Sequence, residues 1–352
     1  MARIQDNDWL YSFLRPWVDW LFRRSFRRFR YVGKENIPTD GAIIFSPNHV
    51  DALCDAMAIL GIDHGPKVFV ARADIFKKER TAKILTWLKI MPIRRVRDGL
   101  DEVRHNDETI DKAVDTLRSQ VPFCILPEGT HHPKHTLLPL NKGIFRIALK
   151  AYHEFGNEKP VYIIPVGLEY GDYFHLWDTL MVNIGKPICI NDYVSQLSEQ
   201  YLTENHEPIT EPQIINALRD ELTLRMRQQI LWVPDDENYE TNWQTLRDNP
   251  HAPFDAFKKR FAPKWLRLML LILLAPLFVL SAAMTIPLWL TWILIQHKIK
   301  DPAFHNSVQY FVQVIFFTLT LCIPLPFWLF FEEYRYQLRY LSSTTRSATE
   351  RR

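Results

Sequence analysis

The sequence has few cysteines and almost no excess charge of either sign. Its four cysteines are scattered and include no Cys-x-x-Cys pair, which disfavours both a disulfide scaffold and a structural zinc site. Lysine and arginine number 43 against 40 acidic residues, and the net charge of +3 is too small to indicate a nucleic-acid-binding protein. No cleavable signal peptide is expected, because Asp6 and Asp8 precede the first apolar residues.

Charge is missing altogether from two long stretches near the carboxyl end. No charged residue lies between Arg267 and His297, or between His305 and Glu332. Each gap exceeds the roughly 20 residues that cross a ~30 Å hydrocarbon core, so the sequence predicts a transmembrane hairpin over residues 265–340. Basic residues crowd the outer flanks of this hairpin, which places the main domain in the cytoplasm. A buried helical hairpin of a soluble protein is the alternative.

The first 30 residues carry seven arginines against three aspartates, a local balance of +4. A helix from Val18 to Arg30 would gather apolar side chains on one arc and arginines on the other. Tryptophans in the same segment favour the headgroup layer of a membrane. We therefore expect residues 1–30 to form an amphipathic interfacial helix beside anionic lipid, with an ordinary surface helix as the alternative. The apolar arc would consist of Val18, Leu21, Phe22, Ser25, Phe26 and Phe29.

Between residues 31 and 190, short apolar runs alternate with helical patterns. This alternation predicts an α/β fold with a mostly parallel central sheet flanked by helices. The capping box of Thr210 and Gln213 predicts the start of a later helix. The expected strands are Ala42–Phe45, Val68–Ala71, Ile90–Ile93, Phe123–Leu126, Val161–Val166 and Met181–Ile184, and the expected helices are Ala52–Leu60, Lys78–Leu88, Asp107–Arg118 and Gly143–Phe155.

The predicted organisation follows from these segments. The interfacial helix precedes an enzyme domain, and a segment rich in Asp, Asn and Pro connects that domain to the membrane hairpin. The expected boundaries are 1–30 for the interfacial helix, 31–233 for the enzyme domain, 234–264 for the linker, 265–340 for the hairpin and 341–352 for a cytoplasmic tail.

The run from Asn48 to Asp55 is the most informative part of the chain. It places His49 on a strand-to-helix turn, where α/β folds collect reactive groups. A histidine with a carboxylate nearby is the minimal arrangement for a general base, and Asp55 is the expected partner. Cys54 suggests a rival scheme with a cysteine nucleophile, but helical geometry turns it away from His49.

Four blocks of residues 41–168 resemble the glycerolipid acyltransferase family, which contains lysophosphatidic acid and glycerol-3-phosphate acyltransferases. The first block contains His49 and Asp55 at the family's catalytic positions. The others are Ile90-Met91-Pro92-Ile93-Arg94-Arg95, Leu126-Pro127-Glu128-Gly129-Thr130 with the Leu138–Gly143 segment after it, and Ile164-Pro165-Val166.

The resemblance implies a role for each site residue. His49 would be the general base and Asp55 would orient it. Arg95 would bind the acceptor's phosphate, helped by Lys142, and Glu128 would lie near the glycerol or phosphate end of the acceptor. Gly129 and Thr130 complete the substrate-binding block, and backbone N–H groups near them are candidate donors to an oxyanion.

Two positions depart from the family pattern. Five residues separate His49 from Asp55 where four are commonest, which leaves Asp51 as a second candidate for the partner carboxylate. His131 stands where the family usually has arginine, and a neutral imidazole is a poorer phosphate ligand than a guanidinium. This departure leaves the acceptor's head group open.

The expected reaction is the transfer of a fatty acyl group from an acyl thioester to lysophosphatidic acid, giving phosphatidic acid. Acyl-CoA or acyl carrier protein would be the co-substrate, and no cofactor is expected. His131, His132 and His135 do not form a recognisable metal set, so no metal is expected either. The expected partners are membrane lipids, and the expected location is an inner or plasma membrane if the source is bacterial. The alternatives are glycerol-3-phosphate or another lysolipid as acceptor, and a non-catalytic membrane scaffold.

Overall fold

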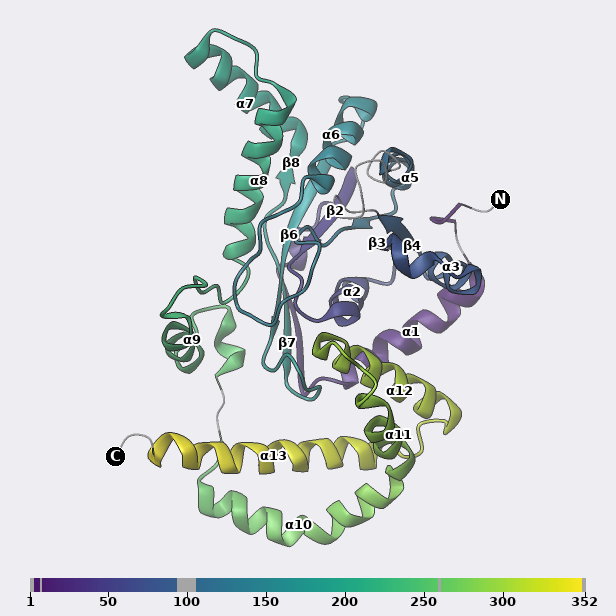
Figure 1. Cartoon of the computed structure of the whole chain (residues 1–352), viewed down its shortest axis with the longest axis vertical. Helices are drawn as coiled ribbons and strands as arrows, with labels where there is room; N and C mark the ends of the chain where they lie inside the picture. The colour runs from purple at the N-terminus through teal and green to yellow at the C-terminus, as the bar shows by residue number, and fades with distance from the viewer. Residues whose placement is uncertain (1–2, 7, 94–105, 259–260, 350–352) are drawn as a thin grey trace. The chain divides into compact units, whose positions relative to one another are not determined.

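The computed structural model describes residues 3–6, 8–93, 106–258 and 261–349 (Figure 1). The chain forms two compact units. The first unit contains most of the sheet and the expected enzyme domain, and the second contains the carboxyl-terminal helices. The first unit is made of residues 1–19, 30–169 and 181–243, and the second of residues 20–29, 170–180 and 244–352.

Among the described residues the sheet has eight strands, in the order β1-β7-β6-β2-β5-β3-β4, with β8 beside β6. The pairs β2–β5, β2–β6, β3–β5 and β3–β4 are all parallel, whereas β8 runs antiparallel to β6. The mostly parallel α/β fold predicted from the sequence is therefore confirmed. The strands are β1 (Arg28–Val32), β2 (Ala42–Pro47), β3 (Val68–Arg72), β4 (Ile90–Ile93), β5 (Phe123–Cys124), β6 (Val161–Tyr170), β7 (Thr179–Ile184) and β8 (Ile188–Cys189).

The helices of the first unit cover this sheet. The main apolar core lies between α5, α6 and α8 and the side chains that β2, β5 and β6 turn toward them, such as Ile44 and Phe123. Side chains alternate along a strand, so Phe45 points to the opposite face, where α2 contacts β2. The helices are α1 (Trp9–Arg24, whose last turn belongs to the second unit), α2 (Ala52–Leu60), α3 (Glu79–Trp87), α5 (Asn106–Arg118), α6 (Gly143–Phe155), α7 (Ile190–Asn205), α8 (Glu211–Arg227) and α9 (Tyr239–Asp248, shared between the units).

Strongly patterned elements match their expected bounds closely. The predicted helices Ala52–Leu60 and Gly143–Phe155 are α2 and α6, and the capping box of Thr210 and Gln213 is present at the start of α8. The segment predicted as a linker differs, because α9 lies within it. The composition of that segment indicates an irregular connector. Tyr239 is buried and Trp243 stacks on His135, however, and this packing stabilises a helix there.

The prediction of one helix from Val18 to Arg30 is wrong in its second half. Helix α1 ends at Arg24, and Arg28–Val32 is the edge strand β1. The run Arg-Phe-Arg-Tyr-Val alternates polar and apolar residues, and so short a run fits a strand as well as a helix. The predicted apolar arc is also covered by protein, since Phe22 lies 5.2 Å from both Phe26 and Tyr310, centroid to centroid.

A different face of α1 is exposed. Trp9 and Phe13, one helical turn apart, are 77% and 74% exposed, and Leu10 beside them is 39% exposed. Exposed aromatic side chains of this size are uncommon on soluble proteins and are typical of surfaces that meet a membrane or a partner.

The second unit contains four helices after residue 260: α10 (Lys264–Met284), α11 (Ile286–Gln296), α12 (His305–Leu319) and α13 (Leu325–Thr349). Helix α13 runs along α10, and α12 contacts α11 (Figure 1). Among the described residues, α10 alone is long and apolar enough to cross a membrane, and most of its apolar side chains are exposed.

Each predicted span is therefore two helices rather than one. The first is interrupted at Thr285, where Pro287 occupies the first turn of α11, and the second is interrupted between Leu319 and Leu325. Proline favours the first turn of a helix because its missing N–H has no partner there. In the second break Leu321 and Cys322 have positive φ angles of 50° and 61°, which ends α12.

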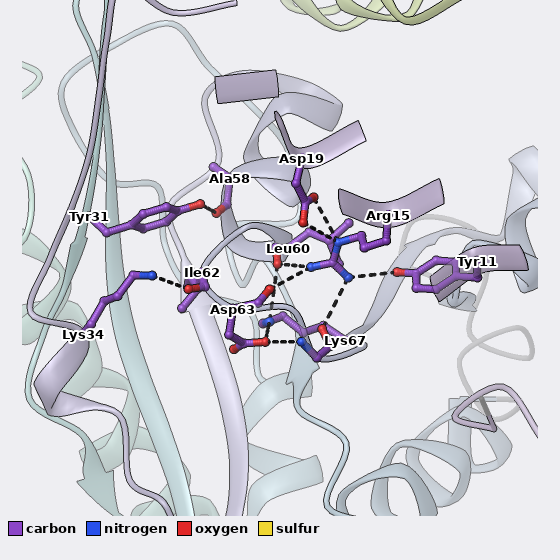
Figure 2. Close-up of polar contacts among 11 residues, drawn as sticks. Tyr11, Arg15, Asp19, Tyr31, Lys34, Ala58, Leu60, Ile62, Asp63 and Lys67 are labelled. Carbon is purple, nitrogen blue, oxygen red and sulfur yellow. Dashed lines mark hydrogen bonds and ion pairs between the residues drawn. The ribbon is translucent and has the colours of Figure 1, made fainter. Parts of the chain in front are cut away.

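A buried ionic cluster attaches α1 to the connection between α2 and β3 (Figure 2). Arg15 donates through Nε to Asp19 at 2.8 Å, and its other nitrogens donate to the Tyr11 hydroxyl and to the main-chain carbonyls of Leu60, Asp63 and Gly65. The side chains of Arg15 and Asp19 are only 4% and 8% exposed. Because Leu60 ends α2, this cluster fixes one end of the helix that carries Asp55.

Arg15→Met is expected to destabilise the first unit, because it leaves Asp19 buried without its counter-ion. Breaking one side of a buried pair typically costs about 3–5 kcal/mol. Thermal unfolding followed by circular dichroism would show a lowered Tm for R15M. The double variant R15M/D19L should recover part of the loss, since it removes both charges. Lys83→Ala, at an exposed ion pair, is the matched control and should change Tm little; an R15M protein as stable as this control would contradict the prediction.

Candidate active site

Two of the sequence blocks meet because their strands are neighbours. β2 and β5 are parallel and in register at Phe45 and Cys124, so the loops that follow them leave the sheet at the same edge. The main chain continues this pairing, with the Ile125 N–H donating to the Phe45 carbonyl at 3.1 Å. The turn that carries His49 and the loop that carries Glu128 are thereby placed side by side.

His49 and Asp55 form a hydrogen-bonded pair. The ring Nδ1 of His49 lies 2.8 Å from Asp55 Oδ2, and the same oxygen accepts the N–H groups of Val50 and Asp51 at 2.8 and 2.9 Å. The Asp55 side chain is fully buried, whereas that of His49 is 17% exposed. A carboxylate that already accepts two N–H groups favours a protonated Nδ1, which leaves Nε2 as the basic nitrogen of the ring.

The carboxylate beside the imidazole is that of Asp55 and not that of Asp51. Asp51 is buried and contributes its main-chain N–H to Asp55. The residue before His49 is also fixed, because the Asn48 side chain bonds the Leu168 main chain through both its amide nitrogen, at 3.1 Å, and its oxygen, at 2.6 Å. The Ile164-Pro165-Val166 block lies in β6, directly beside β2, and therefore supports the His49 turn from one side.

Glu128 contacts the main chain of His49. Its Oε1 accepts the His49 N–H at 2.8 Å, and its Oε2 accepts the Leu138 N–H at 2.8 Å. The side chain is fully buried. Burial raises the pKa of Glu128 to about 8, and the nearby Asp55 carboxylate adds to this rise while the two N–H donors oppose it.

Gly129 and Thr130 turn the chain away from Glu128. Gly129 has a φ of +68°, and a Cβ there would lie 2.7 Å from the Asn141 side-chain nitrogen, so glycine is required by both conformation and space. The Asn141 amide holds this turn through the carbonyls of Pro127 and Glu128. The Gly129 N–H donates to Leu126, whereas the Thr130 N–H makes no hydrogen bond with any residue that the structure describes.

Two histidines lie against the site: His131, which stands at the position where the family usually has arginine, and His132, which sequence reasoning did not place there. The rings of His131 and His49 are 5.4 Å apart and at 79° to each other, an edge-to-face contact. His132 donates its main-chain N–H to the His49 carbonyl at 3.3 Å, and its ring Nδ1 is 3.6 Å from Glu128 Oε2. Burial lowers the pKa of His132. For His132, the position shortly after the Pro-Glu-Gly-Thr block is the sequence signal for this placement.

Lys142, Arg95 and Cys54 are the remaining residues that the sequence singled out. Lys142 is exposed and precedes the first turn of α6, next to Asn141, which bonds the Glu128 loop. Arg95 lies outside the described residues. Cys54 is buried in α2.

His135 binds a carboxylate far from His49 in sequence. Its Nδ1 is 2.6 Å from Glu169 Oε1, and its ring stacks on Trp243 with centroids 3.4 Å apart. The main chain around it accepts the Val233 N–H and donates to the Tyr239 hydroxyl. Over residues 3–6, 8–93, 106–258 and 261–349, no group of three or more His, Cys, Asp or Glu side chains is placed to hold a metal ion.

The raised pKa of Glu128 predicts a pH-dependent stability. The folded protein keeps the Glu128 proton up to about pH 8, whereas the unfolded chain releases it near the ordinary value of 4.5. The folded state therefore binds more protons between these values, and this contribution to stability is present at low pH and lost as the pH rises toward 8. Tm should fall more steeply between pH 5.5 and 8 in the natural protein than in Glu128→Gln. Equal slopes would contradict the prediction, and Glu199→Gln, at an exposed position, is the control.

Comparison with known proteins matches the part of the chain that carries these residues to one family. Residues 28–169, which contain all four blocks, match the family model described as acyltransferase. No curated protein sequence matches the chain. Among solved structures, the 1-acyl-sn-glycerophosphate acyltransferase of Thermotoga maritima is similar, with a TM-score of 0.40 and 19% identity over 62% of this chain and 80% of that one. The match of residues 28–169 to the acyltransferase family model agrees with the family resemblance of the four blocks.

Proposed function

We propose that this protein transfers a fatty acyl group from an acyl thioester to the free hydroxyl of a glycerophospholipid precursor. The observation that carries the proposal is the buried Asp55 carboxylate 2.8 Å from Nδ1 of a partly exposed His49. This arrangement leaves a basic imidazole nitrogen on a residue that solvent reaches. An alcohol is a weak nucleophile at neutral pH, so such a base meets the main requirement of the reaction.

In the proposed reaction His49 Nε2 takes the hydroxyl proton while the hydroxyl oxygen attacks the thioester carbonyl carbon. The carbon–sulfur bond of the resulting tetrahedral intermediate then breaks, and the imidazolium returns its proton to the departing thiolate. The buried Asp55 carboxylate stabilises the imidazolium that exists between these two steps. The Thr130 N–H, which has no partner among the described residues, is the best-placed main-chain donor for the oxyanion, because the Gly129 N–H already donates to Leu126.

Lysophosphatidic acid is the acceptor that we favour, with phosphatidic acid as the product and acyl-CoA or acyl carrier protein as the donor. Arg95 and Lys142 would bind its phosphate. The contact of His131 with His49 supports a second candidate, glycerol-3-phosphate or another lysolipid, because an imidazole stands where the family pattern has a guanidinium.

A lipid acceptor requires a protein that works at a membrane surface. Helix α10 is long and apolar enough to cross a bilayer, and the exposed Trp9 and Phe13 side chains suit the headgroup layer. We infer an integral membrane protein that is anchored by its carboxyl-terminal helices and has its catalytic domain in the cytoplasm. The distribution of basic residues outside the anchor supports this orientation.

His49→Ala is expected to abolish acyl transfer without unfolding the protein. Loss of a general base typically costs roughly 10²- to 10⁴-fold in rate. The measurement is the transfer of a labelled acyl chain from oleoyl-CoA to lysophosphatidic acid in detergent micelles. Asp55→Asn should cause a loss of similar size, since it removes the group that orients the imidazole. His153→Ala, at an exposed position of α6, is the control. Transfer by H49A at the rate of H153A would rule the assignment out.

His131→Arg is expected to favour acceptors whose phosphate is a monoester over an acceptor whose phosphate is esterified to choline. A guanidinium at this position can form charge-assisted hydrogen bonds to the phosphate, which an imidazole forms less well. The KM for lysophosphatidic acid should fall by roughly 10-fold, and the KM for lysophosphatidylcholine should change less. A panel of lysophosphatidic acid, glycerol-3-phosphate and lysophosphatidylcholine, each with one labelled donor, measures this. An equal change for all three acceptors would show that His131 does not face the head group.

A further inference from the structure

Glu128 has no exposed surface, although the family resemblance implies that it contacts the acceptor. A group that binds substrate from this position would first have to leave its present partners. Both oxygens of its carboxylate accept main-chain N–H groups, Oε1 from His49 and Oε2 from Leu138, each at 2.8 Å. The carboxylate therefore joins the two loops of the site to each other.

The same loop holds the His49 main chain at two points. The His49 N–H donates to Glu128, and the His49 carbonyl accepts the His132 N–H at 3.3 Å. The ring is fixed separately, through Nδ1 and Asp55. With the N–H, the carbonyl and Nδ1 all bonded, the direction in which Nε2 points is determined by groups other than the substrate. Such preorganisation matters because a shift of about 1 Å at a reacting group can cost roughly 100-fold in rate.

The chemistry of the position favours a carboxyl group over its isosteres. Two N–H donors face one side chain, and a carboxyl group has acceptor lone pairs on both oxygens even when it is protonated. Glutamine has an acceptor at one end and a second donor at the other, so it satisfies one N–H and opposes the other. Aspartate is one methylene shorter and cannot reach both donors. The raised pKa of Glu128 shows that burying this group is costly, and the fold tolerates that cost at the His49 turn.

We propose that Glu128 is a positioning residue whose carboxyl group holds the His49 main chain in place for proton transfer and does not bind the acceptor. The proposal rests on the proposed function, in which His49 is the general base. It differs from the role implied by the family resemblance, in which loss of Glu128 would weaken acceptor binding.

The two roles differ in their kinetics. If Glu128 positions His49, Glu128→Gln should lower kcat by roughly 10- to 100-fold, because one buried N–H loses its acceptor and the base loses its alignment. The KM for lysophosphatidic acid should stay within about twofold of the natural value. If Glu128 binds the acceptor, the KM should rise and kcat should change less. Glu199→Gln makes the same chemical change at an exposed site of α7 and should alter neither constant.

Four full-length variants measured side by side distinguish failure of the proposed function from failure of the positioning role. They are H49A, E128Q, E128D and E199Q, with lysophosphatidic acid and oleoyl-CoA as substrates. An active H49A protein would defeat the proposed function itself. An inactive H49A together with an E128Q protein that has a raised KM and an unchanged kcat would overturn the positioning role alone. E128Q kinetics identical to those of E199Q would overturn it as well. A lowered kcat at unchanged KM in both E128Q and E128D is the result expected.

Hydrogen–deuterium exchange of the natural protein tests the proposal without relying on a variant that folds. The His49 amide should be protected, because its N–H donates to a buried carboxyl group. Peptides that cover residues 48–51 would be compared with and without saturating lysophosphatidic acid. We expect the His49 amide to keep its protection when the acceptor binds. Loss of that protection would mean that Glu128 leaves His49 to meet the acceptor, and would overturn the proposal.

Discussion

β2 and β5 run side by side in the same direction, and this pairing determines where the reactive groups of the protein meet. The register that sets Phe45 beside Cys124 brings the His49 turn and the Glu128 loop to one edge of the sheet. The contacts of the candidate site then form between the segments that follow these two strands. On the other side of β2, the Asn48 side chain bonds the main chain of Leu168 and so connects the His49 turn to β6. The pairing of the strands thus places the two loops of the site, and side-chain hydrogen bonds then hold the loops together.

The site contains two buried carboxyl groups close to each other, those of Asp55 and Glu128, and burying them costs folding free energy. Asp55 is stabilised by two main-chain N–H groups and by the His49 ring, whereas Glu128 has two N–H groups and only a distant imidazole. Burial raises the pKa of Glu128 to about 8, and its two N–H donors offset only part of that rise. Sites that carry out chemistry often hold such unfavourable groups in place through the surrounding fold. Here the surrounding fold includes the Arg15 cluster, which anchors the far end of the helix that carries Asp55.

The sequence predicts this edge of the sheet better than the rest of the molecule. The strands β2, β3 and β4 and the helices α2 and α6 are bounded by strong periodicity and clear turn residues, and the structure reproduces them. The partner of His49 is ambiguous between Asp51 and Asp55 in the sequence, because only the fold of the turn decides which carboxylate reaches the ring. The family pattern marks the position of His131, whereas the contact of the His132 ring with Glu128 depends on the glycine turn before it.

Other errors have a different cause. The apolar arc of α1 is real, but a sequence cannot say whether lipid or protein covers an apolar face, and here Tyr310 packs against Phe22. Helix α9 is short and polar, and its place depends on the contacts of Tyr239 and Trp243 with His135. Such elements owe their existence to tertiary packing and not to local propensity.

The contact between His135 and Trp243 also determines where the catalytic fold stops. Glu169 follows the last family block, His135 follows the Glu128 loop, and the chain from Leu231 to Trp243 returns to bond both of them. A fragment cut at residue 233, where the sequence places the domain boundary, would keep the His49 turn but lose the aromatic cover over the buried contact of His135 with Glu169. A soluble catalytic fragment prepared for crystallisation must therefore extend past Trp243, and tags or fusion partners belong beyond that residue.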